Sequence, residues 1–305
     1  MAGYRLVTHE AAGGPRAGML VGDRIHDIAA ATGHAADATM LGLLADWEGA
    51  RGRLARMRAA LQRDGVDVAS ARLLAPLPLP GTVFCAGANY SDHVREMARM
   101  RGKEPDPDPR SLGLTAWHFI KSSRAVVGPG AEVSLPLNSR KVDWEVELAV
   151  VIGRRAKNIP VAEALGIVAG YAIANDLSAR DLGPRDGVPD ASPFKYDWLA
   201  HKSFDGSCPF GPWIVPAEDI PDPQALRLSL SVNGAMKQDS NTREMIFGIA
   251  EQISHLSDRL TLWPGDVILT GTPAGVGSAR GEFLRPGDVV TVAVEGIGEF
   301  SNRMA

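Results

Sequence analysis

The chain has 305 residues, of which 45% are hydrophobic and 22% are charged, and this length allows one large hydrophobic core with a small additional domain. The formal net charge of −4 favours neither nucleic acid nor an anionic membrane surface as a partner. No uncharged apolar run approaches the roughly 18 residues that cross a bilayer, which excludes a membrane-spanning helix.

Cysteine usage and the N-terminus predict where the protein resides. The two cysteines, Cys85 and Cys208, form neither a metal-binding spacing nor a disulfide framework, as is usual in a reducing compartment. The N-terminus has no basic segment followed by an apolar one, so we identify no signal peptide. We therefore expect a cytoplasmic protein.

The first part of the chain, residues 1–75, is predicted to form a small N-terminal α+β domain. Short β-branched runs on either side of a Val-Gly-Asp turn indicate strands. A helix is then indicated by apolar residues at helical spacing, namely Ala50, Leu54, Met57 and Leu61. Prolines 76, 78 and 80 mark a linker, so the main domain is expected to comprise residues 76–305.

A strand expected at 82–86 leads into a short helix for which Asp92 is a candidate N-cap. His93 and Glu96 would lie at positions i and i+3 of this helix, close enough to interact. Taken alone, such a pair is more often two surface residues than a catalytic pair. The following stretch is polar, aperiodic and rich in Gly and Pro, so we expect a mobile lid segment near residues 96–118.

An acidic strand is predicted at residues 143–153. Side chains alternate faces along a strand, so Glu145 and Glu147 share one face with about 6.6 Å between them along the backbone. Two carboxylates this close repel each other and resist burial. Either a hard divalent cation neutralises them, or they lie on a solvated face paired with Lys or Arg.

A second apolar run, residues 165–174, ends in Asn175 and Asp176. Polar residues at the end of a buried strand are a common place for a site. Asp176 could supply a third carboxylate beside Glu145 and Glu147. Asn175 and Asp176 are also good residues for capping a turn, and their spacing does not distinguish the two uses.

The last third of the chain contains short strands separated by Gly and Pro, with one main helix predicted at 243–256. This pattern is typical of a β-rich α+β domain. The run Thr270-Gly271-Thr272-Pro273 either offers backbone N–H groups and a hydroxyl to an anion or forms a tight turn between strands.

Five motifs, in this order, resemble those of the fumarylacetoacetate hydrolase family, over roughly residues 80–302. They are the segments 87–97 (GANYSDHVREM), 143–153 (DWEVELAVVIG), 175–181 (NDLSARD), 202–212 (KSFDGSCPFGP) and 265–277 (GDVILTGTPAGVG). The resemblance implies an α+β fold, with a mixed β-roll or β-sandwich-like catalytic domain flanked by helices.

The resemblance implies a metal site and a substrate class. Glu145, Glu147 and Asp176 would bind one Mg²⁺ or Mn²⁺, with Ca²⁺ as a structural substitute. A 2-oxo acid would reach the ion through its carboxylate and its carbonyl. The ion would then act as a Lewis acid and stabilise an enolate when a bond at C3 breaks.

The resemblance also implies roles for other side chains. His93 would take a proton from water, oriented by Glu96, and Lys202 would stabilise developing negative charge. Substrate oxygens would be bound by further polar residues, namely Lys121, Arg180, Gln238 and Thr272. The remaining histidines, His201 among them, have no recognised partner and are interpreted as structural or exposed.

Three reactions share this enolate chemistry. They are C–C hydrolysis of a 2,4-dioxo acid such as an acylpyruvate, decarboxylation of oxaloacetate, and isomerisation of 2-hydroxyhepta-2,4-diene-1,7-dioate. Hydrolysis needs a base for water, which His93 with Glu96 would provide, so we expect a hydrolase. A non-catalytic protein that binds metal or an oxo acid is the competing hypothesis, and the presence of every expected site residue disfavours it.

The segment 181–201 departs from the family pattern, because many relatives are shorter here and carry Gln where this chain has Gly183. This segment would reshape the pocket, so no particular relative's substrate is transferred to this chain. The family also implies a homodimer, although the sequence does not show the interface.

Overall fold

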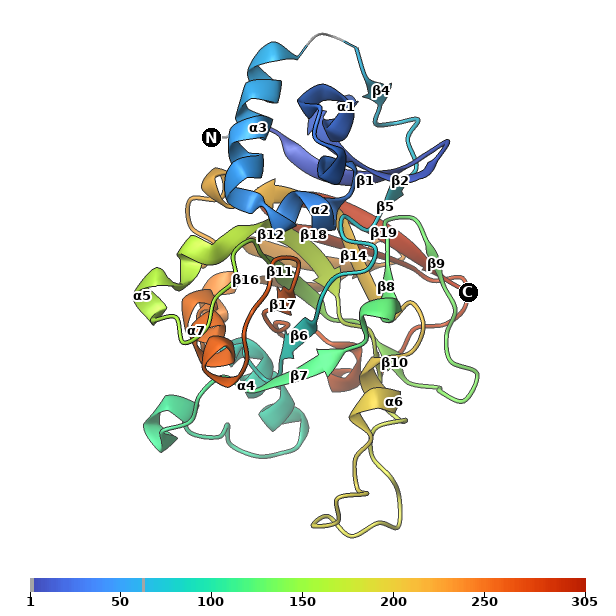
Figure 1. The fold of residues 1–305 in the computed structure, drawn as a ribbon. Helices are drawn as coiled ribbons and strands as arrows, with labels where there is room; N and C mark the ends of the chain where they lie inside the picture. Colours follow the sequence, from blue (N-terminus) through green and yellow to red (C-terminus); the bar gives the residue numbers. More distant parts are fainter. Residues whose placement is uncertain (1–2, 62–63) are drawn as a thin grey trace.

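The computed structural model describes residues 3–61 and 64–305 and has an α+β fold built around a large mixed sheet. Ten strands of this 12-stranded sheet follow one another in the order β4-β3-β2-β1-β14-β12-β11-β17-β6-β7. Two further strands join from the side, where β5 pairs with β1 and β8 pairs with β14. Figure 1 shows the helices arranged around this sheet.

The strands of the large sheet are β1 (Arg5–Ala11), β2 (Gly14–Val21), β3 (Arg24–Asp27), β4 (Val66–Asp67), β5 (Leu73–Leu74), β6 (Val83–Ala86), β7 (His118–Lys121), β8 (Val126–Val127), β11 (Val146–Ile152), β12 (Val168–Asn175), β14 (Cys208–Pro216) and β17 (Val267–Leu269). A second sheet has the order β16 (Ala235–Asn241), β15 (Arg227–Val232), β18 (Val289–Val294), β19 (Gly298–Met304) and β9 (Glu132–Val133). A small antiparallel pair is formed by β10 (Val142–Asp143) and β13 (Ser178–Ala179). The helices are α1 (Ile28–Thr32), α2 (Met40–Ala45), α3 (Trp47–Ala60), α4 (Ser91–Met100), α5 (Val161–Ala164), α6 (Trp198–Lys202) and α7 (Ile249–Arg259).

The N-terminal strands and helices pack directly onto the rest of the molecule (Figure 1). Strand β1 pairs with β14, with Leu6 opposite Ile214, so the N-terminal strands continue the main sheet. Leu6, Leu54 and Val151 belong to one hydrophobic cluster that crosses the expected domain boundary. The core is therefore continuous across residue 75, and the division into two domains there stays a proposal.

The predicted helical spacing in this region matches the observed packing. Ala50, Leu54 and Met57 are buried along α3, as residues three and four apart share a helix face. Leu61 follows at the C-cap.

Strands β11 and β12 form the centre of the sheet, and every residue in both is buried. Val146, Leu148 and Val150 face one hydrophobic cluster, whereas Ala149 and Val151 face another. Because both faces of these strands are covered by apolar side chains, polar groups gather where the strands begin and end.

The predicted acidic strand is interrupted between Asp143, where β10 ends, and Val146, where β11 begins. Asp143 pairs with Ser178 of the small β10–β13 sheet, whereas β11 pairs with β12 in the large one. The indole N–H of Trp144 donates to the carbonyl of Gly275 at 3.0 Å. These contacts bend the chain from one sheet into the other.

Two predicted helix starts are corrected by the structure. Helix α4 begins at Ser91 with Tyr90 as its N-cap, so Asp92 lies in the first turn and is not the cap. Helix α7 begins at Ile249 instead of 243, since residues 242–244 form a separate 3-10 turn. The Gly248 N–H donates to the Glu251 carboxylate at 2.7 Å and stabilises this later start.

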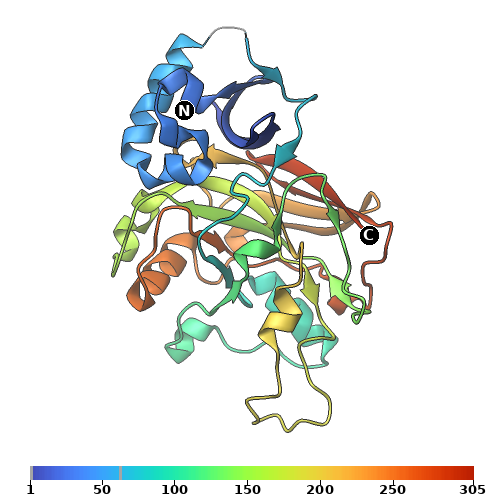
Figure 2. The same cartoon turned by 45° about the vertical axis from the view of Figure 1, so that its right-hand side comes forward.

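Two long connections extend from the body. The segment after α4 contains a 3-10 helix, Pro109–Leu112, and leads into β7. The connection between β13 and α6 projects as a long loop, visible in both ribbon views (Figures 1 and 2). Among the described residues, no helix is long and apolar enough to cross a membrane.

Candidate active site

The three predicted metal ligands come together at one end of β11 and β12. These strands pair antiparallel with Val146 opposite Asn175, which places Glu145 and Glu147 beside Asp176. One carboxylate oxygen from each residue lies within 4.8 Å of the other two. All three side chains are buried. The three residues that the family resemblance implied as metal ligands therefore lie together, and their role as ligands stays a prediction.

Two lysines neutralise part of this negative charge. The Lys202 ammonium donates to Oε2 of Glu145 at 2.8 Å and to Oδ2 of Asp176 at 2.6 Å. Lys121 donates to Oδ1 of Asp176 at 2.5 Å and to the carbonyl of Leu177 at 2.9 Å. Burial would lower the pKa of Lys202, but attraction to Asp176 and Glu145 outweighs it and raises that pKa.

The two glutamates are in different electrostatic states. Burial would raise the pKa of Glu145, but Lys202 and Arg180 lower it below its usual range. Burial raises the pKa of Glu147 well above its ordinary value, and repulsion from Asp176 and Glu145 adds to this. Glu147 accepts a hydrogen bond from the Gly271 N–H at 2.7 Å. Three converging buried carboxylate oxygens are ligands that a hard divalent cation prefers, and such an ion would offset the repulsion that raises the pKa of Glu147.

Asp143 fixes the orientation of Arg180, a role that the sequence did not reveal. Nε of Arg180 donates to Oδ2 of Asp143 at 2.9 Å, and the same guanidinium donates to Glu145. Asp143 also accepts hydrogen bonds from the backbone N–H groups of Gly277 and Ser278. The available signal was the first acidic position of the D-x-E-x-E motif.

A cavity of about 340 Å³ lies against the carboxylate cluster. Of the predicted site residues outside the metal set, four line it: His93, Arg180, Lys202 and Thr272. Glu145 and Glu147 line it as well. The cavity thus places metal ligands, a histidine and a lysine around one volume.

His93 enters this cavity from α4. Its Nδ1 is buried and has no hydrogen-bond partner among the residues that the structure describes. Burial lowers the pKa of His93. The negative charge of Glu145 acts to raise this pKa and the positive charge of Arg180 lowers it further, and the net shift is downward, so the imidazole is neutral near pH 7. A neutral imidazole can accept a proton.

Glu96, which was expected to orient the imidazole, makes no hydrogen bond to the buried Nδ1 of His93. Instead, the Glu96 carboxylate accepts from the Gly275 N–H at 2.7 Å. This bond joins α4 to the loop that follows β17.

Two of the predicted substrate-binding residues lie behind the cavity wall. Lys121 is 1% exposed, and its ammonium group donates hydrogen bonds to the Asp176 carboxylate and the Leu177 carbonyl. The Gln238 amide accepts from the Val146 N–H and donates to Thr272 Oγ1, each at 2.9 Å. Both side chains hold site elements in place, and a direct contact with substrate stays a prediction for each.

One side of the cavity is aromatic, and we predicted no role for these residues from the sequence. The Trp198 ring lies 4.5 Å from that of Tyr196, 5.0 Å from Trp117 and 5.4 Å from Phe119, between ring centroids. All four side chains line the cavity. The available signal was the alternation of aromatic residues at 194, 196 and 198, directly before Lys202.

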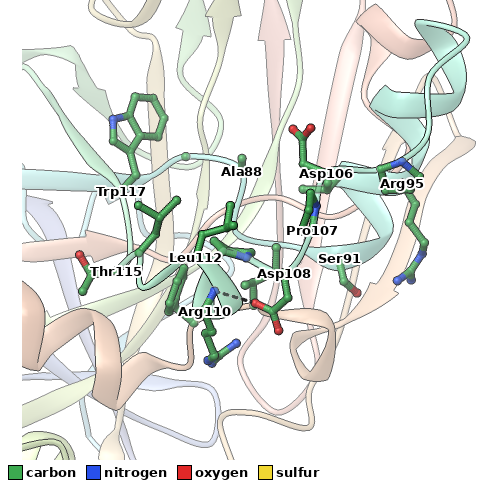
Figure 3. A pocket seen from close by; sticks show the side chains of 17 residues that line it. Ala88, Ser91, Arg95, Asp106, Pro107, Asp108, Arg110, Leu112, Thr115 and Trp117 are labelled. Carbon is green, nitrogen blue, oxygen red and sulfur yellow. Dashed lines mark hydrogen bonds between the residues drawn. The ribbon is translucent and has the colours of Figure 1, made fainter.

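A larger outer cavity of about 740 Å³ adjoins the first one. The segment predicted as a lid forms much of its wall, and Figure 3 shows Asp106, Arg110, Leu112 and Trp117 around it. Asp106 and Trp117 line both cavities. This segment therefore borders both cavities, and its role as a mobile lid stays a prediction.

Comparison with known proteins gives the family. The fumarylacetoacetate (FAA) hydrolase C-terminal family matches residues 82–305. This chain belongs to the fumarylacetoacetate hydrolase family. The match includes every predicted metal ligand and catalytic residue of the site described above.

Relatives in this family carry out different reactions. Oxaloacetate tautomerase Fahd2a, mitochondrial, of Rattus norvegicus is 39% identical over 253 residues, which are 82% of this chain and 75% of that protein. Maleylpyruvate hydrolase from Sphingobium sp. SYK-6, in complex with manganese(II) and pyruvate, has a TM-score of 0.75 and 31% identity, covering 99% of this chain and 98% of the other. The 2-hydroxyhepta-2,4-diene-1,7-dioate isomerase from Mycobacterium marinum has a TM-score of 0.72 and 31% identity, with the same coverage.

These similarities confirm the predicted family and the α+β fold. They also confirm that the fumarylacetoacetate hydrolase family consists of enzymes acting on small organic acids, and that a divalent metal is bound by one of them. Tautomerisation of oxaloacetate was not among the three reactions predicted from the sequence. Family membership is compatible with all four reactions: hydrolysis, decarboxylation, isomerisation and tautomerisation.

Proposed function

We propose that this protein is a divalent-metal-dependent enzyme that hydrolyses a C–C bond in a 2,4-dioxo acid of the acylpyruvate type. The observation that carries the proposal is one cavity that is lined by Glu145, by Glu147 and by His93, whose imidazole is neutral near pH 7. A cytoplasmic location and a homodimeric state remain predictions.

Glu145, Glu147 and Asp176 would hold Mg²⁺ or Mn²⁺, for which three carboxylates leave further positions open to a substrate. When bound, the ion supplies a Lewis acid next to the 2-oxo carbonyl. The manganese(II) and pyruvate in the Sphingobium relative support this assignment. Lys202, which bonds two of the three carboxylates, stays beside the developing negative charge and stabilises it.

The protein's own residues supply the proton transfers. His93 accepts a proton from the water molecule that attacks the C4 carbonyl of the dioxo acid. The C3–C4 bond then breaks, its electron pair remains on C3, and C4 leaves as a carboxylic acid. Protonation of C3 completes pyruvate. Arg180, fixed by Asp143, keeps a positive charge next to Glu145 throughout.

Keto–enol tautomerisation of oxaloacetate is the second candidate, and the contact of Glu96 favours it. Glu96 bonds to the Gly275 N–H and leaves His93 without the partner that would orient it for attack by water. A tautomerase moves one proton from C3 to the C2 carbonyl oxygen and needs no attacking water, so a single neutral base that takes the proton from C3 and returns it to the oxygen is sufficient. The name of the rat relative agrees with this alternative.

Parallel turnover assays test the proposal. Acetylpyruvate, oxaloacetate and 2-hydroxyhepta-2,4-diene-1,7-dioate are each supplied with Mg²⁺, with Mn²⁺ or with EDTA. We expect acetylpyruvate to yield equimolar pyruvate and acetate only when a metal is present. Faster interconversion of oxaloacetate tautomers with no cleavage of acetylpyruvate would replace the hydrolase by the tautomerase, and cleavage that is unaffected by EDTA would overturn the metal assignment.

A further inference from the structure

A histidine that the proposed chemistry does not use lies in the cavity wall next to Lys202. His201 is 3% exposed and lines the cavity from α6. Its Nδ1 is hydrogen-bonded to the phenolic oxygen of Tyr196. Its Nε2 is buried and has no partner within residues 3–61 and 64–305. A buried polar atom without a partner is destabilising, so a ligand atom is the natural partner.

His201 is an uncharged group in this position. Burial lowers its pKa to about 2, and the positive charges of Lys202 and Arg180 contribute to the shift. Near pH 7 the ring therefore carries one N–H and one lone pair, and the hydrogen bond with Tyr196 occupies only one of the two nitrogens. Nε2 therefore has the capacity for one further hydrogen bond, as a donor or an acceptor according to the tautomer.

The absence of a side chain at Gly183 makes room for this pair. A Cβ at position 183 would lie 2.7 Å from the phenolic oxygen of Tyr196 and 3.0 Å from Nδ1 of His201. The Gly183 carbonyl also accepts the Asp197 N–H at 2.8 Å, which holds the two ends of the projecting loop together. The chain is thus built locally to accommodate a tyrosine and a histidine in contact.

Aromatic packing fixes the imidazole plane. The His201 ring stacks on Trp198 with 5.7 Å between centroids and 16° between planes. Trp198 in turn packs on Tyr196 and Phe119. A ring held on one side by stacking and at one nitrogen by a phenol presents its other nitrogen in a fixed direction.

We propose that Nε2 of His201, with Tyr196 as its positioning residue, binds an oxygen at the distal end of the substrate's acyl group and so selects acyl groups that carry one. The inference rests on the proposed function and names its substrate class: acylpyruvates with a distal carboxylate, carbonyl or hydroxyl, preferred over those with a hydrocarbon end. A site that bonds a substrate oxygen discriminates against the analogue without it, because its own polar atom is then left unpaired.

The test compares succinylpyruvate, which has a distal carboxylate, with pentanoylpyruvate, which has a hydrocarbon end of similar length. We expect the wild type to prefer succinylpyruvate in kcat/KM by about tenfold or more, as one or two hydrogen bonds allow. His201→Leu should remove most of this preference through KM, with a smaller change in kcat. His201→Gln, which keeps a donor and an acceptor, should restore part of it.

Two further variants separate a positioning role from general damage. Tyr196→Phe keeps the ring packing but removes the hydroxyl, and we expect an intermediate loss of preference. Gly183→Ala removes neither polar group but displaces both, so it should reduce the preference as well. Leu199→Ala, on the same helix with a side chain that is 70% exposed, is the matched control and should keep the wild-type preference.

Calorimetric titration of both acids with Mg²⁺ present distinguishes the two ways of failing. A wild type that binds neither acid overturns the proposed function and this inference together. A wild type that cleaves both acids without preference, or a His201→Leu variant that loses activity equally on both, overturns the role of His201 and leaves the proposed function standing.

Discussion

The carboxylate side of the cavity and its aromatic side differ in how their polar atoms are satisfied. On the carboxylate side, Glu145 and Asp176 accept hydrogen bonds from Lys202, and Arg180 is held by two carboxylates. On the aromatic side, Nε2 of His201 is buried without a partner in the described part of the chain. The carboxylates of the first side lie at the ends of central strands, whereas His201 and Tyr196 of the second lie on α6 and its preceding loop.

This difference suggests a division of labour, in which the carboxylate side carries out the reaction and the aromatic side recognises the substrate. Strands covered on both faces hold charged groups in one arrangement, as a bound ion and a developing negative charge require. Loops that lie against these strands can change without unfolding the sheet, and they carry the groups that meet variable parts of a substrate. Variants on the first side should therefore affect every substrate, and variants on the second should affect selectivity.

The largest effect is expected from Glu147→Ala. Loss of a metal ligand removes the transition-state stabilisation of several kcal/mol that a bound ion provides, so metal-dependent turnover should fall by about a thousandfold. Without metal, the fold should be as stable as the wild type or more stable, because burial and two like charges raise the pKa of Glu147. Turnover assays and metal-free thermal unfolding measure the two effects.

Glu163→Ala, at an exposed position of α5, is the control for this variant. Wild-type turnover by Glu147→Ala, or full wild-type activity in EDTA, would show that the triad does not hold a catalytic metal.

His93→Ala should reduce C–C cleavage by about a hundredfold or more, as loss of a general base does. Its pKa is lowered from 6.5, so the imidazole is neutral above that lowered value. The wild-type rate should rise with pH through an inflection below pH 6.5 and then level off, and the inflection should be absent from the variant. A pH–rate profile of kcat/KM checks this.

Metal affinity should be unchanged in His93→Ala, and Arg99→Ala at an exposed position of the same helix serves as the control. Loss of metal binding in His93→Ala would make this histidine a ligand and contradict the assigned role.

Lys121→Met tests whether Lys121 supports Asp176 or contacts substrate. Removing one partner of a buried ion pair leaves the other charge uncompensated, so the free energy of unfolding without metal should fall by about 3 kcal/mol. Saturating Mg²⁺ should reduce this loss, since the cation would take over part of the compensation. Denaturant unfolding with and without Mg²⁺ measures both values.

Lys141→Met, at an exposed position, is the control for charge removal. Unchanged stability together with a raised KM would instead support the predicted contact between Lys121 and substrate.

The smallest effect is expected from Arg110→Ala in the lid segment. Arg110 donates to both oxygens of Glu251 at 2.7 and 3.0 Å and lies 4.8 Å from the Phe247 ring centroid, but both charged groups are exposed. Such pairs contribute about 0.5 kcal/mol, so KM for acetylpyruvate should change by less than about threefold. A tenfold change in KM would show that this ion pair controls access to the site.

The sequence predicted the buried core of the site well because its signals are local. Alternation places Glu145 and Glu147 on one strand face, and a polar residue after an apolar run places Asp176 at a strand end. Whether the three carboxylates meet depends on the pairing of β11 with β12, which these local patterns do not encode. The Asp92 cap and the start of α7 were predicted wrongly because the observed N-caps, Tyr90 and Gly248, make no side-chain cap hydrogen bond and so leave no cap signal in the sequence.

The sequence by itself determined the α+β class, the family and the three carboxylates. Only the tertiary structure decided that Glu96 bonds to Gly275, 179 positions away, and that Gln238 lies behind the wall next to Val146, 92 positions away. It also decided that Tyr196 and His201 meet above a glycine. Periodicity fixes which face a side chain occupies, but contacts between distant segments depend on how whole elements pack, and no local pattern encodes that packing.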